Sequence, residues 1–267
     1  MDRLNTIIEE NRKYWTQRAK GYSEYNMTEF GSECREKWKN ELLKLIGERF
    51  GTGAEYAGAE AGTPLKVLDI GTGPGFFAVL LAEEGFDVTA ADLTPSMLDE
   101  ARANAGGLAE KITFLEMNAE SLLFPEESFD IIVSRNLTWN LPHPGKAYAE
   151  WTRVLKNGGL LLNFDANWYH YLFNEEALKA YENDRSAAAE KGIRDENIGE
   201  NFDVMEDIAR RVPLSRIKRP EWDIKLLGDL GLKAEADTGF GEKVLSEEDK
   251  ISFASTPMFM IKAVKEL

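Results

Sequence analysis

The sequence predicts an α/β fold built on a seven-stranded, mostly parallel sheet with helices on both faces. From Leu65 onward, short apolar runs alternate with helical stretches, a pattern typical of parallel strands joined by crossover helices. A glycine-rich turn follows the first apolar run, and an acidic residue ends the second. These observations predict a Rossmann-like sheet whose ligand site lies at the carboxyl ends of the strands.

Residues 1–50 are expected to be helical and to form an N-terminal lid. Within them Trp38, Leu42, Leu45 and Ile46 recur at the spacing of one helix face, which predicts a stripe packed against a core. Residues 51–64 are rich in glycine and alanine without periodicity and predict a loop. The cofactor-binding core is expected over residues 51–166.

Five strands are expected in that core, at 66–70, 87–92, 112–118, 129–134 and 160–165. Helices are expected between them at 76–85, 95–105 and 145–159, and the Gly158-Gly159 pair is expected to end the last one as a left-handed cap. Residues 220–267 are expected to complete the core. There a helix with Pro220 near its start and Gly231 past its end precedes two strands, at 232–239 and 252–265.

Residues 167–219 are far longer than a usual connection between a strand and a helix. They contain helical stretches at 174–192 and 201–212, so we expect a helical cap inserted after strand five, over the carboxyl edge of the sheet. Residues 210–219 form a basic island (RRVPLSRIKR) in an acidic chain. This island is interpreted as a helix end neutralised by local acids; the alternative is a grip on an anionic acceptor.

Composition narrows the classes of partner. A formal net charge of −15 repels phosphate backbones and anionic membranes, so neither nucleic acid nor a membrane is expected as a partner. The longest apolar run has seven residues, 76–82, and the charged N-terminus does not resemble a signal peptide, which predicts a cytoplasmic location. The single cysteine, Cys34, excludes an internal disulfide and cysteine-rich metal sites. We expect it to be a packed residue, and we expect no metal.

The glycine-rich turn predicts the class of ligand. Glycines between a buried strand and a helix let a ligand approach main-chain N–H groups at the helix N-terminus. Asp92, about 20 residues past the turn, is placed to accept hydrogen bonds from a ribose diol, which favours an adenosine-type ligand. A dinucleotide site needs a small residue where this chain has Phe76, and the chain has no Tyr-x-x-x-Lys pair. An NAD-dependent dehydrogenase is therefore the less favoured alternative.

The pattern Asp69-x-Gly71-x-Gly73-x-Gly75 resembles motif I of the class I S-adenosylmethionine-dependent methyltransferases. The resemblance continues through DLTPSM (92–97), NAESLLFP (118–125), SFDIIV (128–133) and RVLKNGG (153–159), and it covers about residues 65–165. It implies S-adenosyl-L-methionine as the cofactor. It also implies that Gly71, Thr72, Gly73 and Gly75 wrap the amino-acid end of the cofactor and that Asn136 lies beside the methionine moiety. Asp69 is implied to serve the ammonium group of the cofactor through water or the loop backbone.

The same resemblance assigns the nucleoside end. Asp92 is expected to bind the ribose, with Leu93 and Met97 against the adenine and Asn118 and Ala119 at its edge. The family often has Asp where this chain has Asn118, but an amide oxygen still accepts from the adenine amino group.

The N-terminal stretch 14–22 resembles the aromatic lid segment of small-molecule methyltransferases. This resemblance implies that Tyr14, Trp15 and Tyr22 close over the cofactor. The alternative is a simple amphipathic helix.

Two stretches that follow strands four and five, SRNLTWNLPHP (134–144) and DANWYHY (165–171), are expected to face the methyl acceptor. They supply the candidate general bases His143, Asp165 and His170. They also supply the candidate acceptor wall, formed by Trp139, Asn140, Trp168 and Tyr169. The alternative for the aromatic residues is packing between cap and sheet.

The sequence thus predicts transfer of a methyl group from S-adenosylmethionine to a small-molecule acceptor by in-line displacement. The alternative is a non-catalytic protein that binds S-adenosylmethionine, such as a sensor or partner subunit. A small-molecule acceptor is the expected partner, and the chain is expected to be a monomer or homodimer.

Overall fold

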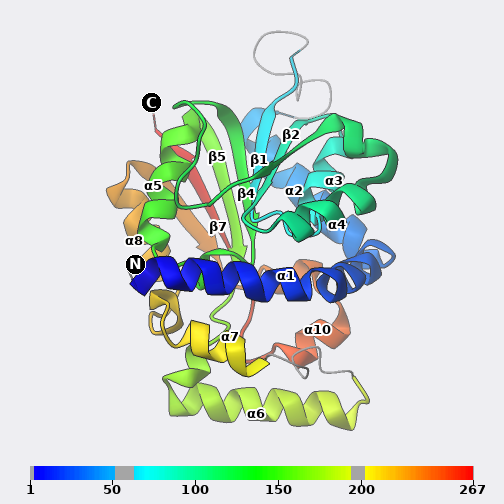
Figure 1. Cartoon of the computed structure of the whole chain (residues 1–267), viewed down its shortest axis with the longest axis vertical. Helices are drawn as coiled ribbons and strands as arrows, with labels where there is room; N and C mark the ends of the chain where they lie inside the picture. Colours follow the sequence, from blue (N-terminus) through cyan, green and yellow to red (C-terminus); the bar gives the residue numbers. More distant parts are fainter. Residues whose placement is uncertain (1–2, 52–62, 194–201, 267) are drawn as a thin grey trace.

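The computed structural model describes residues 3–51, 63–193 and 202–266, and it arranges seven strands in one sheet in the order β3-β2-β1-β4-β5-β7-β6 (Figure 1). The strands are β1 Lys66–Ile70, β2 Asp87–Asp92, β3 Ile112–Glu116, β4 Phe129–Arg135, β5 Leu155–Asp165, β6 Leu232–Asp237 and β7 Phe259–Lys265. Strands β1 to β5 pair in parallel, and β7 runs antiparallel to both β5 and β6. The predicted α/β class and the mostly parallel seven-stranded sheet are confirmed.

Helices cover both faces of the sheet because alternate strand residues point to opposite sides. Val67 lies in a hydrophobic cluster with α2 and α3, whereas Leu68 lies in a second cluster with α5 and α8. Trp38 is fully buried in the first cluster, and Cys34 is packed there too. The bounds are α2 Glu33–Phe50, α3 Phe76–Glu83, α4 Pro95–Ala105, α5 Pro144–Val154 and α8 Glu221–Asp229, with a 3-10 turn, η2, at Gly106–Lys111.

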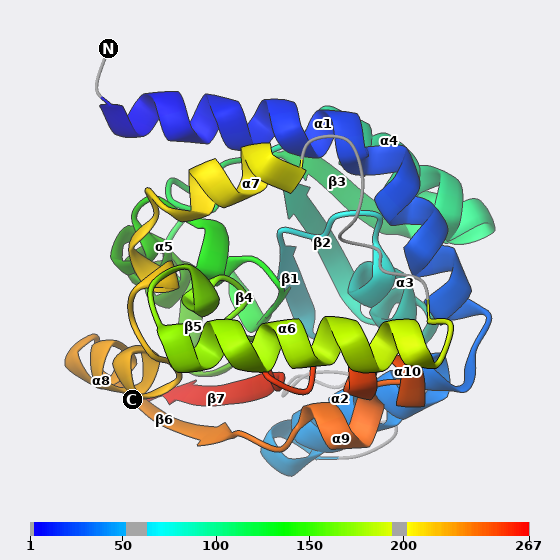
Figure 2. The same cartoon turned by 90° about the horizontal axis from the view of Figure 1, so that it is seen from below.

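The long helix α1, Arg3–Phe30, lies across the carboxyl edge of the sheet (Figures 1 and 2). It contacts α4 and α7. Near its N-terminal end, Ile7 and Tyr14 are buried in a third cluster with Trp139 and with Met205 and Ile208 of α7. This packing anchors α1 over the strand ends.

The segment between β5 and α8 is largely helical beyond the same edge, with α6 farthest from the sheet (Figure 1). Its elements are η4 His170–Leu172, α6 Glu175–Glu190, α7 Phe202–Ala209 and η5 Pro213–Ser215. The short helices α9 Gly241–Val244 and α10 Glu247–Ser252 follow β6, and α10 contacts α6. Most of the loop predicted at 51–64 and the first residue of the helix predicted at 201–212 lie outside the described residues.

The prediction of one helix over 145–159 is wrong at its end. Helix α5 stops at Val154, and β5 begins at Leu155. Phe129 of β4 pairs with Leu155, but Ile131 pairs with Leu160, so the Gly-Gly pair lies in a bulge of β5. Gly158 does adopt the expected left-handed conformation, at φ +74°, and its carbonyl accepts from the Arg49 side chain at 2.8 Å.

The prediction of a strand over 252–265 is also wrong in its first half, because β7 begins only at Phe259. The preceding residues form α10, whose N-cap Ser246 accepts from the backbone N–H of Asp249. A serine cap followed by acidic residues in the first turn favours a helix. Strands β3 and β6 also end two residues earlier than predicted.

No helix in the described part of the chain has both the length and the apolar character needed to cross a membrane.

Candidate active site

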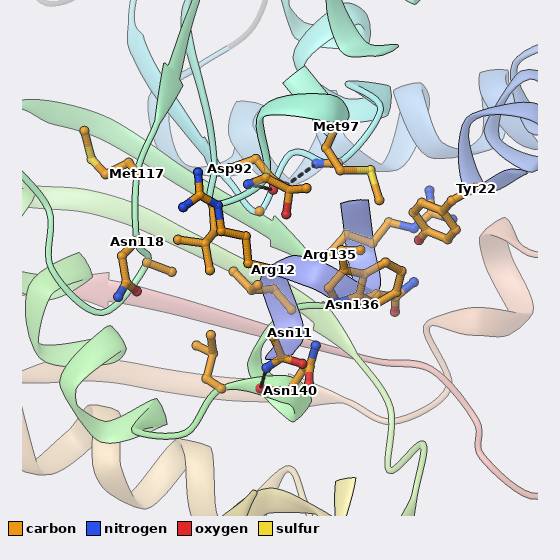
Figure 3. A pocket seen from close by; sticks show the side chains of 18 residues that line it. Asn11, Arg12, Tyr22, Asp92, Met97, Met117, Asn118, Arg135, Asn136 and Asn140 are labelled. Atoms are coloured by element: carbon orange, nitrogen blue, oxygen red, sulfur yellow. Dashed lines mark hydrogen bonds between the residues drawn. The ribbon is translucent and has the colours of Figure 1, made fainter. Parts of the chain in front are cut away.

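A cavity lies at the carboxyl edge of the sheet, where α1 faces the loops that follow β1, β2, β3 and β4 (Figure 3). Eighteen residues line it: Asn11, Arg12, Trp15, Tyr22, Gly71, Gly73, Asp92, Leu93, Thr94, Met97, Met117, Asn118, Ala119, Arg135, Asn136, Leu137, Asn140 and Leu141.

The glycine turn after β1 is folded tightly onto β2. The backbone N–H groups of Gly71 and Thr72 both donate to the carbonyl of Ala91, at 2.8 and 3.1 Å. Gly71 has φ +68°, and a Cβ there would lie 2.7 Å from Leu137 Cδ2, so only glycine fits. Gly71 and Gly73 line the cavity, whereas Thr72 and Gly75 do not. Gly75 instead lies against α4, where an added Cβ would come within 3.0 Å of Ala101.

Two carboxylates hold this turn. Asp92 accepts from the N–H of Gly73 at 2.9 Å and from that of Thr94 at 2.8 Å, and burial raises its pKa. Asp69 lies behind the turn and accepts from the Thr72 hydroxyl at 2.7 Å. Burial raises the pKa of Asp69 to about 7, although the Thr72 hydroxyl lowers it in part.

Asn136, directly after β4, has a left-handed backbone with φ +55°. The indole N–H of Trp139 donates to its carbonyl at 2.9 Å, and its own N–H donates to Phe164 at 2.8 Å. These bonds hold its side chain at the cavity next to Tyr22 (Figure 3). The Asn136 Oδ1 is buried without a hydrogen-bond partner.

Leu93, Met97, Asn118 and Ala119 also line the cavity, as does Met117, which the sequence did not predict. The Asn118 Oδ1 accepts from the N–H of Glu120 at 2.9 Å. A carbonyl oxygen has two lone pairs, so a second donor is still able to bind there.

Helix α1 contributes one side of the cavity through residues that share a helix face. Trp15 and Tyr22 were predicted, but Asn11 and Arg12 were not. The signal was present, since Asn11 lies four residues before Trp15 on the helix. Asn11 Nδ2 donates to the backbone carbonyl of Asn140 at 3.0 Å. The remaining predicted lid residue, Tyr14, packs in the third cluster instead.

Arg135, the last residue of β4, was also missed. Its guanidinium lies 5.0 Å from the ring centroid of Phe76 and 4.8 Å from that of Trp38. It donates to both oxygens of Glu29 on α1 at 2.9 Å. Phe76 stands at the position where a dinucleotide motif has a small residue. Its ring contacts the Arg135 guanidinium, which joins the sheet to α1.

None of the three candidate bases lines the cavity. His143 lies 2.9 Å from Glu120 through its Nδ1, and His170 Nδ1 lies 3.3 Å from the Ser215 carbonyl. Asp165 is fully buried, where it accepts from the N–H of Trp139 at 3.0 Å and pairs with Arg219 at 2.6 Å. These contacts favour structural roles for all three.

Of the four predicted acceptor-wall residues, Asn140 alone lines the cavity. Trp139 and Tyr169 stack at 5.0 Å between ring centroids in the cluster shared with α1 and α7. Trp168 packs edge-on against Phe253 at 5.2 Å. The aromatic residues thus follow the alternative of packing between cap and sheet.

The basic island at 210–219 is largely neutralised. Three of its arginines form ion pairs with nearby carboxylates. Arg210 pairs with Glu206, and Arg211 pairs with Glu10 and Asp207. Arg219 is buried and pairs with Asp165 and Asp223. Arg216 lies over the ring of Phe173 at 4.0 Å. These contacts agree with the interpretation that the basic residues belong to a helix end neutralised by local acids, rather than to a binding site for an anionic acceptor.

The comparison with known families points to the same loops. A family described as "Methyltransferase domain" matches residues 68–163, which run from β1 to β5 and include the glycine turn, Asp92 and Asn136. The chain carries the domain of class I S-adenosylmethionine-dependent methyltransferases. S-adenosylmethionine is the cofactor of this domain. The unpartnered Asn136 Oδ1 fits the ammonium group of this cofactor, and the glycine turn at the cavity fits its amino-acid end.

Relatives of this methyltransferase domain extend over only part of the chain. A demethylmenaquinone methyltransferase of Deinococcus radiodurans is 37% identical over 125 residues, which make up 46% of this chain and 52% of that protein. The chain thus spans about half the length of the curated relatives it matches.

Two solved structures share the fold. A methyltransferase of Aquifex aeolicus has a TM-score of 0.52 at 18% identity, over 89% of this chain and 96% of that one. Phosphoethanolamine N-methyltransferase 2 of Haemonchus contortus, solved with S-adenosyl-L-methionine, has a TM-score of 0.54 at 19% identity, over 85% of this chain and 53% of that one.

Proposed function

We propose that the protein transfers the methyl group of S-adenosylmethionine to a small-molecule acceptor. The observation that carries this proposal is the convergence of Gly71, Gly73, Asp92 and Asn136 on one cavity that α1 borders. When bound, the cofactor supplies a methyl group activated by a positively charged sulfur. In such a displacement the protein has to align the acceptor with the methyl group and exclude water.

Each part of the cavity wall has a role in this proposal. The carboxylate oxygens of Asp92 already accept from the backbone N–H groups of Gly73 and Thr94, and their remaining lone pairs are suited to the ribose hydroxyls. Asn136 Oδ1, buried and unpartnered, is suited to the ammonium group of the methionine moiety. The apolar side chains of Leu93 and Met97 are suited to the adenine faces.

Helix α1 serves as the lid. Trp15 and Tyr22 from this helix border the cavity and reduce the access of water to it. The covered site and the net charge of −15 support a small acceptor rather than a nucleic acid. A cytoplasmic location and a monomer or homodimer stay predictions.

Calorimetry on the whole chain tests the cofactor assignment. We expect binding of S-adenosylmethionine and S-adenosylhomocysteine and no binding of NAD. Binding of NAD alone would instead support the dehydrogenase.

The second test is turnover. Incubation with S-adenosylmethionine and a small-molecule extract of the native cells is expected to form S-adenosylhomocysteine, whereas each component alone is not. Tight cofactor binding without any acceptor-dependent product would support the non-catalytic sensor instead. The quinone acceptor named for the Deinococcus radiodurans relative is one compound to include.

A further inference from the structure

We infer that Asn11 and Asn140 form the binding subsite for the methyl acceptor, and that this subsite selects an amine. The inference rests on the proposed function and names the acceptor class of the same site. It also identifies two residues that determine specificity.

The geometry begins with a hydrogen bond between the two asparagines. Asn11 Nδ2 donates to the backbone carbonyl of Asn140 at 3.0 Å. A carbonyl only accepts, so this bond fixes the amide orientation of Asn11 and leaves its Oδ1 for another partner. The Oδ1 atoms of Asn11 and Asn140 are both buried without a hydrogen-bond partner.

Both side chains are more than nine-tenths buried, with Asn11 7% exposed and Asn140 6% exposed. Both line the cavity, and they lie next to one another on the side away from Asp92 and Met97 (Figure 3). Two unpaired amide oxygens in one buried wall are costly unless a ligand donates to them.

The acceptor group that fits these two oxygens has to donate hydrogen bonds. A quinone carbonyl only accepts, and a carboxylate or thiolate is repelled by the partial negative charge of amide oxygens. Amines and hydroxyl groups remain.

The lack of an available general base among the described residues that line the cavity favours an amine over a hydroxyl group as the methyl acceptor. Among the described residues that line it there is no histidine, and the carboxylate is Asp92, whose two oxygens accept from the backbone N–H groups of Gly73 and Thr94. A hydroxyl or a carbon acid needs a base to become a nucleophile. A neutral amine already has a lone pair and donates its N–H bonds at the same time.

In the proposed step, the amine enters as the neutral free base, having left its ammonium proton in bulk water. Its two N–H bonds then point to the amide oxygens, and its lone pair points to the methyl carbon. The new N–C bond forms as the C–S bond breaks, and the electron pair of that bond stays on sulfur. The methylated ammonium then loses its proton to water.

The first experiment identifies the atom that is methylated. The whole protein is incubated with S-adenosylmethionine labelled with ¹³C in the methyl group and with a small-molecule extract of native cells. Carbon NMR distinguishes methyl groups on nitrogen, oxygen, sulfur and carbon. An N-methyl product supports the inference, and a product methylated on any other atom overturns it. No product at all, with cofactor binding intact, contradicts the proposed function itself.

The second experiment tests the two residues. Asn11→Leu and Asn140→Leu are expected to raise the KM of the identified acceptor by about 10-fold or more each, since each removes one hydrogen bond to a polar ligand. The Kd of S-adenosylhomocysteine is expected to stay unchanged. Calorimetric binding of the acceptor to the S-adenosylhomocysteine complex is expected to weaken by the same factor.

Asn104→Leu is the matched control. Asn104 also faces α1, through a 3.0 Å hydrogen bond to Ser23, and donates to the Pro74 carbonyl at 3.0 Å, but it does not line the cavity. It is expected to leave acceptor binding unchanged. Equal losses in all three variants, or unchanged acceptor binding in Asn11→Leu and Asn140→Leu, would show that the asparagines do not contact the acceptor.

Discussion

The two sides of the cavity differ in how their residues are distributed along the chain. The cofactor side consists of residues at or after the carboxyl ends of β1, β2, β3 and β4, from Gly71 to Leu137. The α1 side joins Asn11 to Asn140, 129 positions apart. A local pattern specifies the first side, because glycine and aspartate are needed at the ends of particular strands. The second side exists only because α1 packs over the strand ends.

The attachment of α1 shows the same contrast between its two ends. Near its C-terminus, Glu29 pairs with Arg135, and these side chains are only 10% and 13% exposed. Nearer its N-terminus, Arg12 pairs with Glu116 at 2.6 Å, with 37% and 49% exposure. Buried pairs depend strongly on both partners, whereas exposed pairs contribute little. Of these two ion pairs, the one near the C-terminus of α1 therefore contributes more to holding the helix in place.

The largest effect is expected from breaking that anchor. Glu29→Leu leaves the Arg135 guanidinium buried and unpaired, which costs about 3 kcal/mol of the free energy of unfolding. Urea unfolding measures this loss. Glu36→Leu serves as the control because Glu36 pairs with Arg35 at a site where its own side chain is 59% exposed. Equal stability of the two variants would show that the C-terminal end of α1 is not anchored by this pair.

The next effect is confined to the cofactor side. Gly71→Ala combines a left-handed φ of +68° with a 2.7 Å approach to Leu137, so the Kd of S-adenosylhomocysteine is expected to rise about 100-fold, or about 2.7 kcal/mol. Gly85→Ala is the control, since Gly85 has φ +87° but no atom within 4 Å of an added Cβ. An unchanged Kd in Gly71→Ala would remove the turn from the cofactor site.

The third prediction concerns pH and the buried Asp69. Its pKa of about 7 in the cofactor-free protein is raised from the ordinary 3.8, so the carboxyl is partly protonated near neutrality. A cofactor ammonium group favours the carboxylate, and binding then releases a proton. The affinity for S-adenosylmethionine is expected to fall by up to about tenfold per pH unit below 7 and to level off above it.

Calorimetry between pH 5.5 and 8.5, values about 1.5 units on either side of the pKa, measures this slope. Asp69→Asn is expected to flatten it, and a slope that persists in the variant would assign it to another group.

The sequence predicts the fold and most of the strand-end residues that line the cavity, and the reason is physical. Gly71 and Asp92 can be recognised from their immediate neighbours in the sequence, because a strand followed by a tight turn and a helix requires these residue types at those positions. Arg135 was missed because its place at the cavity depends on packing between α1 and the sheet, which no local pattern encodes. Asn11 was missed although its helical spacing from Trp15 was present in the sequence. Tertiary packing also explains why Trp139, expected at the acceptor wall, lies in the third cluster and does not line the cavity.

The histidines show the opposite error. His143 and His170 were chosen for the chemistry of their side chains, yet the structure turns their Nδ1 atoms toward Glu120 and the Ser215 carbonyl. Residue type suggests a capacity for proton transfer, but tertiary contacts decide whether that capacity faces a ligand. In the fold itself, the Gly158 bulge was mistaken for a helix end because both features use a left-handed glycine.

The smallest effect is expected at the exposed ion pair between Arg12 of α1 and Glu116. Arg12→Ala removes a pair whose partners are both more than one-third exposed, so a change below about 1 kcal/mol is expected, or less than about fivefold in the Kd of S-adenosylhomocysteine. Added salt screens such a pair, so the difference between Arg12→Ala and the unchanged protein is expected to shrink further at high ionic strength.

Arg12 also lines the cavity, so it could contact the cofactor directly. The double variant Arg12→Ala with Glu116→Ala distinguishes such a contact from the effect of the ion pair. If Arg12 acts only through Glu116, the double variant matches Arg12→Ala. A loss of more than tenfold that persists in high salt and in the double variant would place Arg12 on the cofactor and make the two ends of α1 equal in importance.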